Sequence, residues 1–219
     1  MTASNQINRF TLDSMQRLYG SAIPIVGLTG GIGTGKSTIS QMLTNDGYAV
    51  ISADQLVKNI YLKNESFEFI KKTCPQAIKE HKIDFTILRS EVFHDEILKQ
   101  SIEDFIYQRL PEAFQRELEN FKPAPKLIIY DIPLLFEKKL QDKFDLTVLV
   151  YAPKDLQIQR ATKRDGSSKE VIQKIIASQL SIESKKTLAH YVVDNSLDFN
   201  HLKEEYAKLA VFFHSHFRL

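Results

Sequence analysis

Short apolar runs alternate along the chain with segments in which apolar residues recur every three or four positions. The runs predict five buried strands, at about 23–28, 48–51, 126–130, 146–151 and 187–193. The longer spacing predicts a helix after the first strand, where Ile39, Met42 and Leu43 repeat, and another from Leu202 to Phe213. Strands that alternate with helices in this way favour an α/β fold.

The stretch from Gln55 to about Lys122 differs, because strand-like runs disappear and helical spacing takes over. The clearest apolar series is Leu98, Ile102, Phe105, Ile106, Leu110, Phe114, Leu118 and Phe121. Pro111 lies inside this series and removes a helix hydrogen bond, so we expect a kink or the junction of two helices there. An all-helical segment of this length exceeds what a strand crossover requires. We interpret residues 55–122 as a substrate-binding insertion in a core of residues 22–54 and 124–219.

Another helical segment begins after Pro153, a favoured residue at a helix start. Arg160 and Arg164 lie four residues apart and share one helix face, which suits a phosphate chain, although spacing alone favours a solvated basic face. Ser167 and Glu170 match a capping box that opens the next helix. The inward positions of that helix are predicted to be Ile172, Ile175, Ile176, Gln179 and Leu180. Two helices joined by so short a hinge predict a lid over residues 154–185.

The composition is typical of a globular protein and does not indicate a nucleic-acid-binding or membrane protein. The chain has 219 residues, of which 43% are hydrophobic and 26% charged, and this suits one globular core with an insertion. A net charge of +2 gives no indication of a nucleic-acid surface. No apolar run is long enough to span a membrane, and the lone Cys74 is interpreted as an incidental, half-buried thiol. We therefore expect a cytoplasmic protein without nucleic-acid or membrane partners.

Residues 1–21 form an N-terminal extension that precedes the first strand. The apolar residues between Leu12 and Tyr19 favour a short amphipathic helix, and the polar residues around them favour a mostly mobile tail. The pattern does not separate these alternatives, and it assigns the extension no role.

The strongest chemical signal follows the first strand, where residues 30–37 read GGIGTGKS and match a phosphate-binding loop. Glycines let successive backbone N–H groups turn around an anion, and the positive end of the following helix points at the same place. Lys36 is expected to contact the β- and γ-phosphates of a nucleotide, and the Ser37 hydroxyl to bind Mg²⁺. The predicted nucleotide-binding residues are Gly31, Ile32, Gly33, Thr34, Gly35, Lys36, Ser37 and Thr38.

Two carboxylates are expected at the same edge of the sheet. Asp54 follows the second strand and Asp131 ends the third, and ligands of open α/β sheets bind outside the carboxyl ends of the strands. Asp131 has the form of a second nucleotide-site motif, whose carboxylate reaches Mg²⁺, although many strands end in Asp only to begin a turn. The alternative for Asp54 is a helix N-cap that serves only the segment after it.

Several motifs occur in order between about Ile23 and Ala210: Val26–Thr38, Ala53-Asp54, Leu88-Arg89, Asp131–Glu137, Gln157 with Arg160 and Arg164, Gln179 with Lys185, and Val193–Asn195. Together they resemble the motifs of the dephospho-coenzyme A kinase family. The segment Pro133–Glu137 and the pair Asp194-Asn195 are more particular to this family than the phosphate loop, which many nucleotide enzymes share.

The resemblance implies transfer of the γ-phosphoryl group of ATP to the ribose 3′-hydroxyl of dephospho-coenzyme A, the last step of coenzyme A synthesis. It also implies a five-stranded parallel core of the P-loop kinase type, an inserted helical domain for the acceptor, and a mobile lid. Carried over by position, Asp54 is the candidate base, Lys36 and Ser37 handle phosphates and Mg²⁺, and Arg160 and Arg164 match lid cations. A monomer or a small homo-oligomer is consistent with these features.

The chain departs from the family pattern at a few positions. The family often has Asp at the position of Ser52, Arg at Lys58, a His-Pro pair at Tyr107-Gln108, and Asp at His190. Because of Lys58 and Tyr107-Gln108, the residues that contact the acceptor stay unassigned. The residues expected to carry out phosphoryl transfer match the family pattern.

Two other functions use the same core. A small-metabolite or nucleoside monophosphate kinase would share the phosphate loop and differ in its acceptor. A nucleotide-dependent switch or binding module would need no acceptor. Against a switch, the chain lacks the Asn-Lys-x-Asp motif that reads guanine, and Asp131 is not followed by glycine two residues later.

Overall fold

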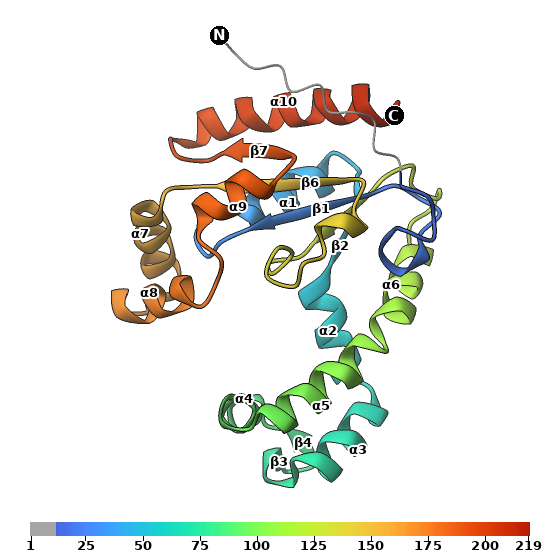
Figure 1. Ribbon diagram of the computed structural model, residues 1–219, viewed down its shortest axis with the longest axis vertical. Helices are drawn as coiled ribbons and strands as arrows, with labels where there is room; N and C mark the ends of the chain where they lie inside the picture. Colours follow the sequence, from blue (N-terminus) through green and yellow to red (C-terminus); the bar gives the residue numbers. More distant parts are fainter. Residues whose placement is uncertain (1–11) are drawn as a thin grey trace. The chain divides into compact units, whose positions relative to one another are not determined.

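The computed structural model describes residues 12–219, which divide into two compact units (Figure 1). Unit 1 contains residues 12–50 and 122–219, and unit 2 contains Ile51–Phe121. Unit 2 overlaps the stretch that the hydrophobic pattern marks as an insertion. Its role in binding a substrate stays a prediction.

A five-stranded sheet organises the larger unit. Its strands are β2 (Ala49–Ser52), β5 (Ile128–Asp131), β1 (Ile25–Gly30), β6 (Leu146–Tyr151) and β7 (Tyr191–Asp194), in this order across the sheet. The central strand β1 pairs in parallel with β5 and β6, and β6 pairs in parallel with β7. The predicted α/β fold with five strands is confirmed, although β1 begins two residues later than the apolar run indicates.

Helices α1 (Lys36–Asn45) and α10 (Phe199–Phe217) pack against this sheet, and α10 lies alongside β7 (Figure 1). Ile39 and Leu43 of α1 join Leu209 and Phe213 of α10 in one buried cluster with the strand residues. Burying each such side chain contributes about 1.5–3 kcal/mol. The cluster therefore holds α1 firmly, together with the loop that precedes it. No helix among residues 12–219 combines the length and the apolar character that crossing a bilayer requires.

The predicted lid segment, residues 154–185, contains α7 (Lys154–Asp165), α8 (Lys169–Ala177) and the first half of α9 (Ile182–Leu188). A small buried cluster of Ile158, Ala161 and Ile172 joins α7 to α8, and Ile32 of the phosphate loop packs against it. Ile172 is thus inward-facing as predicted, whereas Ile175 and Leu180 are each 37% exposed. Helix α9 also includes residues 187–188, so the predicted start of the last strand at Thr187 is wrong.

The capping box predicted for α8 is displaced by one residue. The N-cap is Ser168 and not Ser167, because the Ser168 hydroxyl accepts a hydrogen bond from the Val171 backbone N–H. Both serines are suitable caps by residue type, but α8 begins at Lys169, so Ser168 is the residue that directly precedes the helix.

Unit 2 consists mainly of helices: α2 (Ala53–Tyr61), α3 (Asn64–Thr73), α4 (Phe85–His94), α5 (Glu96–Tyr107) and α6 (Leu110–Glu119). Between α3 and α4, β3 (Ile78–Lys79) and β4 (Lys82–Ile83) form an antiparallel hairpin, so the all-helical prediction is wrong there. The turn is closed by Glu80 and His81, which both have positive φ. Pro111 lies in the first turn of α6, which confirms the predicted junction of two helices. Cys74 is fully buried, not half-buried as predicted.

The described part of the N-terminal extension is attached to unit 1. Residues 1–11 lie outside the described residues. Residues 12–21 contain a short 3₁₀ turn, η1 (Leu18–Gly20), and not the amphipathic helix that was one of the two alternatives for this segment. Arg17 Nε donates to Asp145 Oδ2 at 2.8 Å, and the Leu12 and Ile25 backbone N–H groups donate to the same carboxylate at 3.1 and 2.8 Å. Residues 12–21 are therefore anchored beside the starts of β1 and β6.

Replacing Arg17 by Met is expected to lower the free energy of unfolding by about 3–5 kcal/mol, because Asp145 would stay buried without its cation. The two side chains are only 9% and 0% exposed. Urea unfolding followed by circular dichroism measures the change. Lys208→Met is the control: it breaks an ion pair of similar length whose lysine is 62% exposed, and it should change stability little. A small effect of both variants would contradict the anchoring role of Arg17.

Candidate active site

The phosphate loop lies between β1 and α1, at the carboxyl end of the central strand. Gly33 and Gly35 have φ values of 72° and 91°, a left-handed conformation that favours glycine. Gly35 is also the N-cap of α1, so the unpaired N–H groups of the first helical turn and the positive end of the helix open onto the loop. This geometry suits a phosphate group.

Two buried residues of unit 1 pack closely against the loop. A Cβ at Gly31 would lie 2.8 Å from Gln157 Oε1, and a Cβ at Gly33 would collide with the backbone carbonyl oxygen of Gln157. A Cβ at Gly35 would collide with Nδ2 of Asn195. Gln157 and Asn195 are only 2% and 6% exposed, so neither can easily move away. The loop therefore needs its glycines for space as well as for backbone conformation.

Lys36 and Asp131 come together at this edge of the sheet. Lys36 is the first residue of α1, Asp131 is the last residue of β5, and their side chains form an ion pair. The side chains are 15% and 9% exposed, so the pair is partly shielded from water. Ser37 and Thr38 follow in the first turn of α1 and are exposed. The start of α1 thus carries the Lys36 ammonium group and the exposed Ser37 side chain, and the Asp131 carboxylate contacts Lys36.

Asp54 lies in unit 2 as the second residue of α2, and its side chain is exposed. The N-cap of this helix is Ser52, whose hydroxyl accepts a hydrogen bond from the Gln55 backbone N–H at 3.3 Å. The alternative interpretation of Asp54 as the N-cap is therefore wrong. Serine and aspartate are both favoured N-caps, so Ser52 can keep the local role of the aspartate that the family often has there.

The two arginines of the predicted lid have separate partners. Arg160 donates from Nη1 to the Asn195 carbonyl at 2.9 Å and from Nη2 to the Leu197 carbonyl at 3.2 Å. Arg164 forms an ion pair with Asp165, and this hydrogen-bonded contact raises the pKa of Arg164 and lowers the pKa of Asp165. Arg160 thus ties α7 to the segment after β7, whereas Arg164 stays at the exposed end of α7.

A buried ion pair joins the end of the lid segment to the loop after β5. Lys185 of α9 is fully buried, and its Nζ lies 2.7 Å from Glu137 Oε1. The same oxygen accepts the Leu180 backbone N–H at 3.1 Å. A buried ammonium needs such a partner, because desolvation of an isolated charge is costly. In the sequence these two residues stand out only as family matches, and nothing in their local pattern indicates that they meet.

His190 replaces an aspartate of the family pattern. Its Nδ1 accepts the Thr147 backbone N–H at 3.0 Å, and its own backbone N–H donates to Thr147 Oγ1 at 3.1 Å. A carboxylate oxygen could accept the first of these bonds equally well. Desolvation lowers the pKa of His190, which favours the neutral ring that this bond requires. The substitution therefore preserves a link between the starts of β6 and β7.

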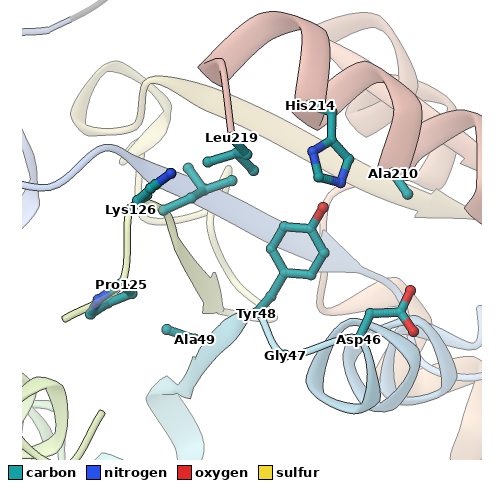
Figure 2. Close-up of a pocket in the computed structure, with 10 residues that line it drawn as sticks. Asp46, Gly47, Tyr48, Ala49, Pro125, Lys126, Ala210, His214 and Leu219 are labelled. Carbon is teal, nitrogen blue, oxygen red and sulfur yellow. The ribbon is translucent and has the colours of Figure 1, made fainter. Parts of the chain in front are cut away.

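Two of the cavities in unit 1 lie at opposite edges of the sheet. One, of about 340 Å³, is lined by Gly31 of the phosphate loop and by lid residues that include Gln157, Ile176 and Gln179. The other, of about 450 Å³, lies near the amino end of β5, where Figure 2 shows Tyr48 and His214 facing each other. Ligands of parallel α/β sheets bind at the carboxyl edge. The cavity beside Gly31 is therefore the candidate site.

Comparison with known proteins agrees with this geometry. A family model described as dephospho-CoA kinase matches residues 24–201. The dephospho-CoA kinase of Sulfurimonas denitrificans is 37% identical over 182 residues, which cover 82% of this chain and 89% of that protein. TT1252 from Thermus thermophilus has a TM-score of 0.78 at 30% identity, with 87% of this chain and 96% of that chain covered. A dephospho-CoA kinase from Campylobacter jejuni has a TM-score of 0.64 at 26% identity, with 85% and 95% covered. The chain therefore belongs to the dephospho-CoA kinase family and is a kinase of the phosphate-loop type.

Proposed function

We propose that this kinase transfers the γ-phosphoryl group of ATP to the ribose 3′-hydroxyl of dephospho-CoA, which yields CoA and ADP and completes CoA biosynthesis. Membership of the family supports the acceptor. The observation that carries the proposal is the phosphate loop, in which left-handed Gly33 and Gly35 lead into α1 and Lys36 stands beside them. The small-molecule substrates also favour a cytoplasmic enzyme.

Lys36 and the loop amides are assigned to the phosphate chain of ATP. In phosphoryl transfer the transition state is loose and its negative charge spreads over the equatorial oxygens, so positioning and charge stabilisation dominate. The ion pair with Asp131 keeps the Lys36 ammonium beside the loop in the absence of nucleotide. Phosphate oxygens would then compete with Asp131 for this ammonium.

Ser37 and Asp131 are assigned to Mg²⁺. A hydroxyl and a carboxylate are hard oxygen donors of the kind that Mg²⁺ prefers, and both belong to the edge of the sheet at which Lys36 lies. A bound Mg²⁺ ion would neutralise charge on the phosphates. When Lys36 turns from Asp131 to the phosphates, the Asp131 carboxylate becomes available for this second role.

Asp54 is assigned to the acceptor. Its exposed carboxylate would orient the 3′-hydroxyl and accept its proton late in the transfer. Arg160 and Arg164 would supply lid cations, which requires Arg164 to exchange Asp165 for a phosphate. Closure of residues 154–185 would keep water from intercepting the phosphoryl group.

A panel of acceptors tests the proposal directly. ADP release is measured with purified protein, ATP and Mg²⁺ in the presence of dephospho-CoA, nucleoside monophosphates, shikimate or gluconate. Only dephospho-CoA is expected to raise ADP release above the rate without acceptor. A preference for another acceptor would identify a different small-molecule kinase, and nucleotide binding without any acceptor-dependent release would favour a switch or binding module.

A further inference from the structure

Asn195 connects three parts of unit 1 at the carboxyl edge of the sheet. It follows β7 directly, and its backbone N–H donates to the Tyr151 carbonyl at the end of β6 at 2.8 Å. Its side-chain Nδ2 donates to the Thr34 carbonyl of the phosphate loop, also at 2.8 Å. Its own carbonyl accepts Nη1 of Arg160 at 2.9 Å. The residue is therefore held from two sides while its side-chain amide contacts the loop.

The contact with Thr34 determines where the next backbone N–H points. A trans peptide unit is planar, so the carbonyl of Thr34 and the N–H of Gly35 point in opposite directions. The Thr34 carbonyl points to the side-chain amide of Asn195, and the Gly35 N–H is consequently directed away from Asn195. The left-handed φ of Gly35 and the collision that a Cβ would have with Asn195 Nδ2 are consistent with this fixed orientation.

Few other partners are available to the Thr34 carbonyl. Thr34 is fully buried, and its hydroxyl is already used, because it donates to the Gly31 carbonyl at 2.9 Å. Without the Asn195 amide, the carbonyl would be buried without a hydrogen bond unless the peptide rotated. Such a rotation would turn the Gly35 N–H away from the anion site.

We propose that Asn195 is a positioning residue for phosphate binding, which acts by orienting the Thr34–Gly35 peptide so that the Gly35 N–H faces the phosphate chain. This inference rests on the proposed function of the loop as the ATP site. Because Arg160 binds the carbonyl of the same residue, the orientation of the loop is also linked to the start of the lid.

The test uses inorganic tripolyphosphate, which carries the phosphates of ATP without the nucleoside. Calorimetry on the wild-type protein and on Asn195→Ala should show roughly tenfold weaker binding to the variant, the factor that corresponds to about 1.4 kcal/mol. The KM for ATP should rise by a similar factor, with the KM for dephospho-CoA changed by less than about twofold. Asn200→Ala, which removes an exposed amide from α10, is the control and should bind tripolyphosphate like the wild type.

The outcomes separate this inference from the proposed function. Equal binding of tripolyphosphate by wild type and Asn195→Ala would overturn the role of Asn195 and leave the loop as the phosphate site. Failure of the wild type to bind tripolyphosphate or ATP would overturn both. A second measurement needs no variant: in ¹⁵N-labelled wild-type protein, tripolyphosphate should shift the Gly35 amide resonance and slow its hydrogen exchange. A Gly35 amide that does not respond would also overturn the proposal.

Discussion

Replacing Asp54 by Asn is expected to lower turnover by roughly 10²–10⁴ while the KM for ATP stays nearly unchanged. The amide keeps the size of the side chain but cannot accept the proton of the 3′-hydroxyl. The N-cap of α2 is Ser52, so the substitution removes no capping bond from the helix. Steady-state ADP release at saturating dephospho-CoA measures turnover, and variation of ATP gives its KM.

Two further variants show whether the loss belongs to Asp54 itself. Ser52→Ala removes the N-cap of α2 and should cost about 1 kcal/mol of stability, with a much smaller loss of turnover than Asp54→Asn. Glu68→Gln neutralises another exposed carboxylate of unit 2, on α3, and should leave turnover unchanged. Near-normal turnover of Asp54→Asn would exclude Asp54 as the base.

The second large effect is expected for Lys36→Ala, which should lower turnover by roughly 10²–10³ and weaken ATP binding as well. Lys36 is proposed to contact the phosphates both before and during transfer, so its loss affects ground state and transition state together. Kinetics with ATP as the varied substrate separate the two parameters. This combined loss distinguishes Lys36 from Asp54, whose replacement should leave ATP binding intact.

The ion pair of Lys36 with Asp131 requires a control for stability. Lys36→Ala leaves Asp131 without its cation, so thermal unfolding is compared for the wild type and the variant before the kinetics are interpreted. Lys208→Met removes an exposed lysine far along the chain, on α10, and should leave turnover unchanged. Unaltered turnover and ATP binding of a folded Lys36→Ala protein would mean that the loop is not the phosphate site.

Local patterns in the sequence predict those features of this protein that depend only on neighbouring residues. A strand buried on both faces requires a nearly continuous apolar run, and β6 accordingly matches the run from Leu146 to Tyr151, interrupted only by Thr147, at both ends. The phosphate loop requires glycine wherever φ is positive, so Gly33 and Gly35 mark it within a few residues. Pro111 cannot lie inside a regular helix, and it therefore marks the junction of α5 and α6.

Contacts between residues that are far apart in the sequence cannot be predicted from local patterns. Asn195 and Thr34 are 161 positions apart, and Arg17 Nε binds a carboxylate 128 positions away. Each of these residues is ordinary in its own segment, and only burial beside a particular partner gives it a role. The same holds for Lys185, which reads as one basic residue among several until α9 places it beside Glu137.

The sequence by itself determined the α/β class, the five strands and the phosphate loop, because each depends on residue types at short spacing. It also determined the family to which the chain belongs, because several distinctive motifs occur in order between about Ile23 and Ala210. Tertiary structure alone decided that Ser52 and not Asp54 caps α2, that Ser168 and not Ser167 caps α8, and that Arg160 and Arg164 have separate partners. Residues that compete for a helix cap are favoured there about equally by type, so the sequence pattern does not choose between them. The fold chooses, because only the side chain directly before the first helical residue reaches the unpaired backbone N–H groups of the first turn. In the same way, Arg160 meets its carbonyl partners only because the chain returns to α7 after β7.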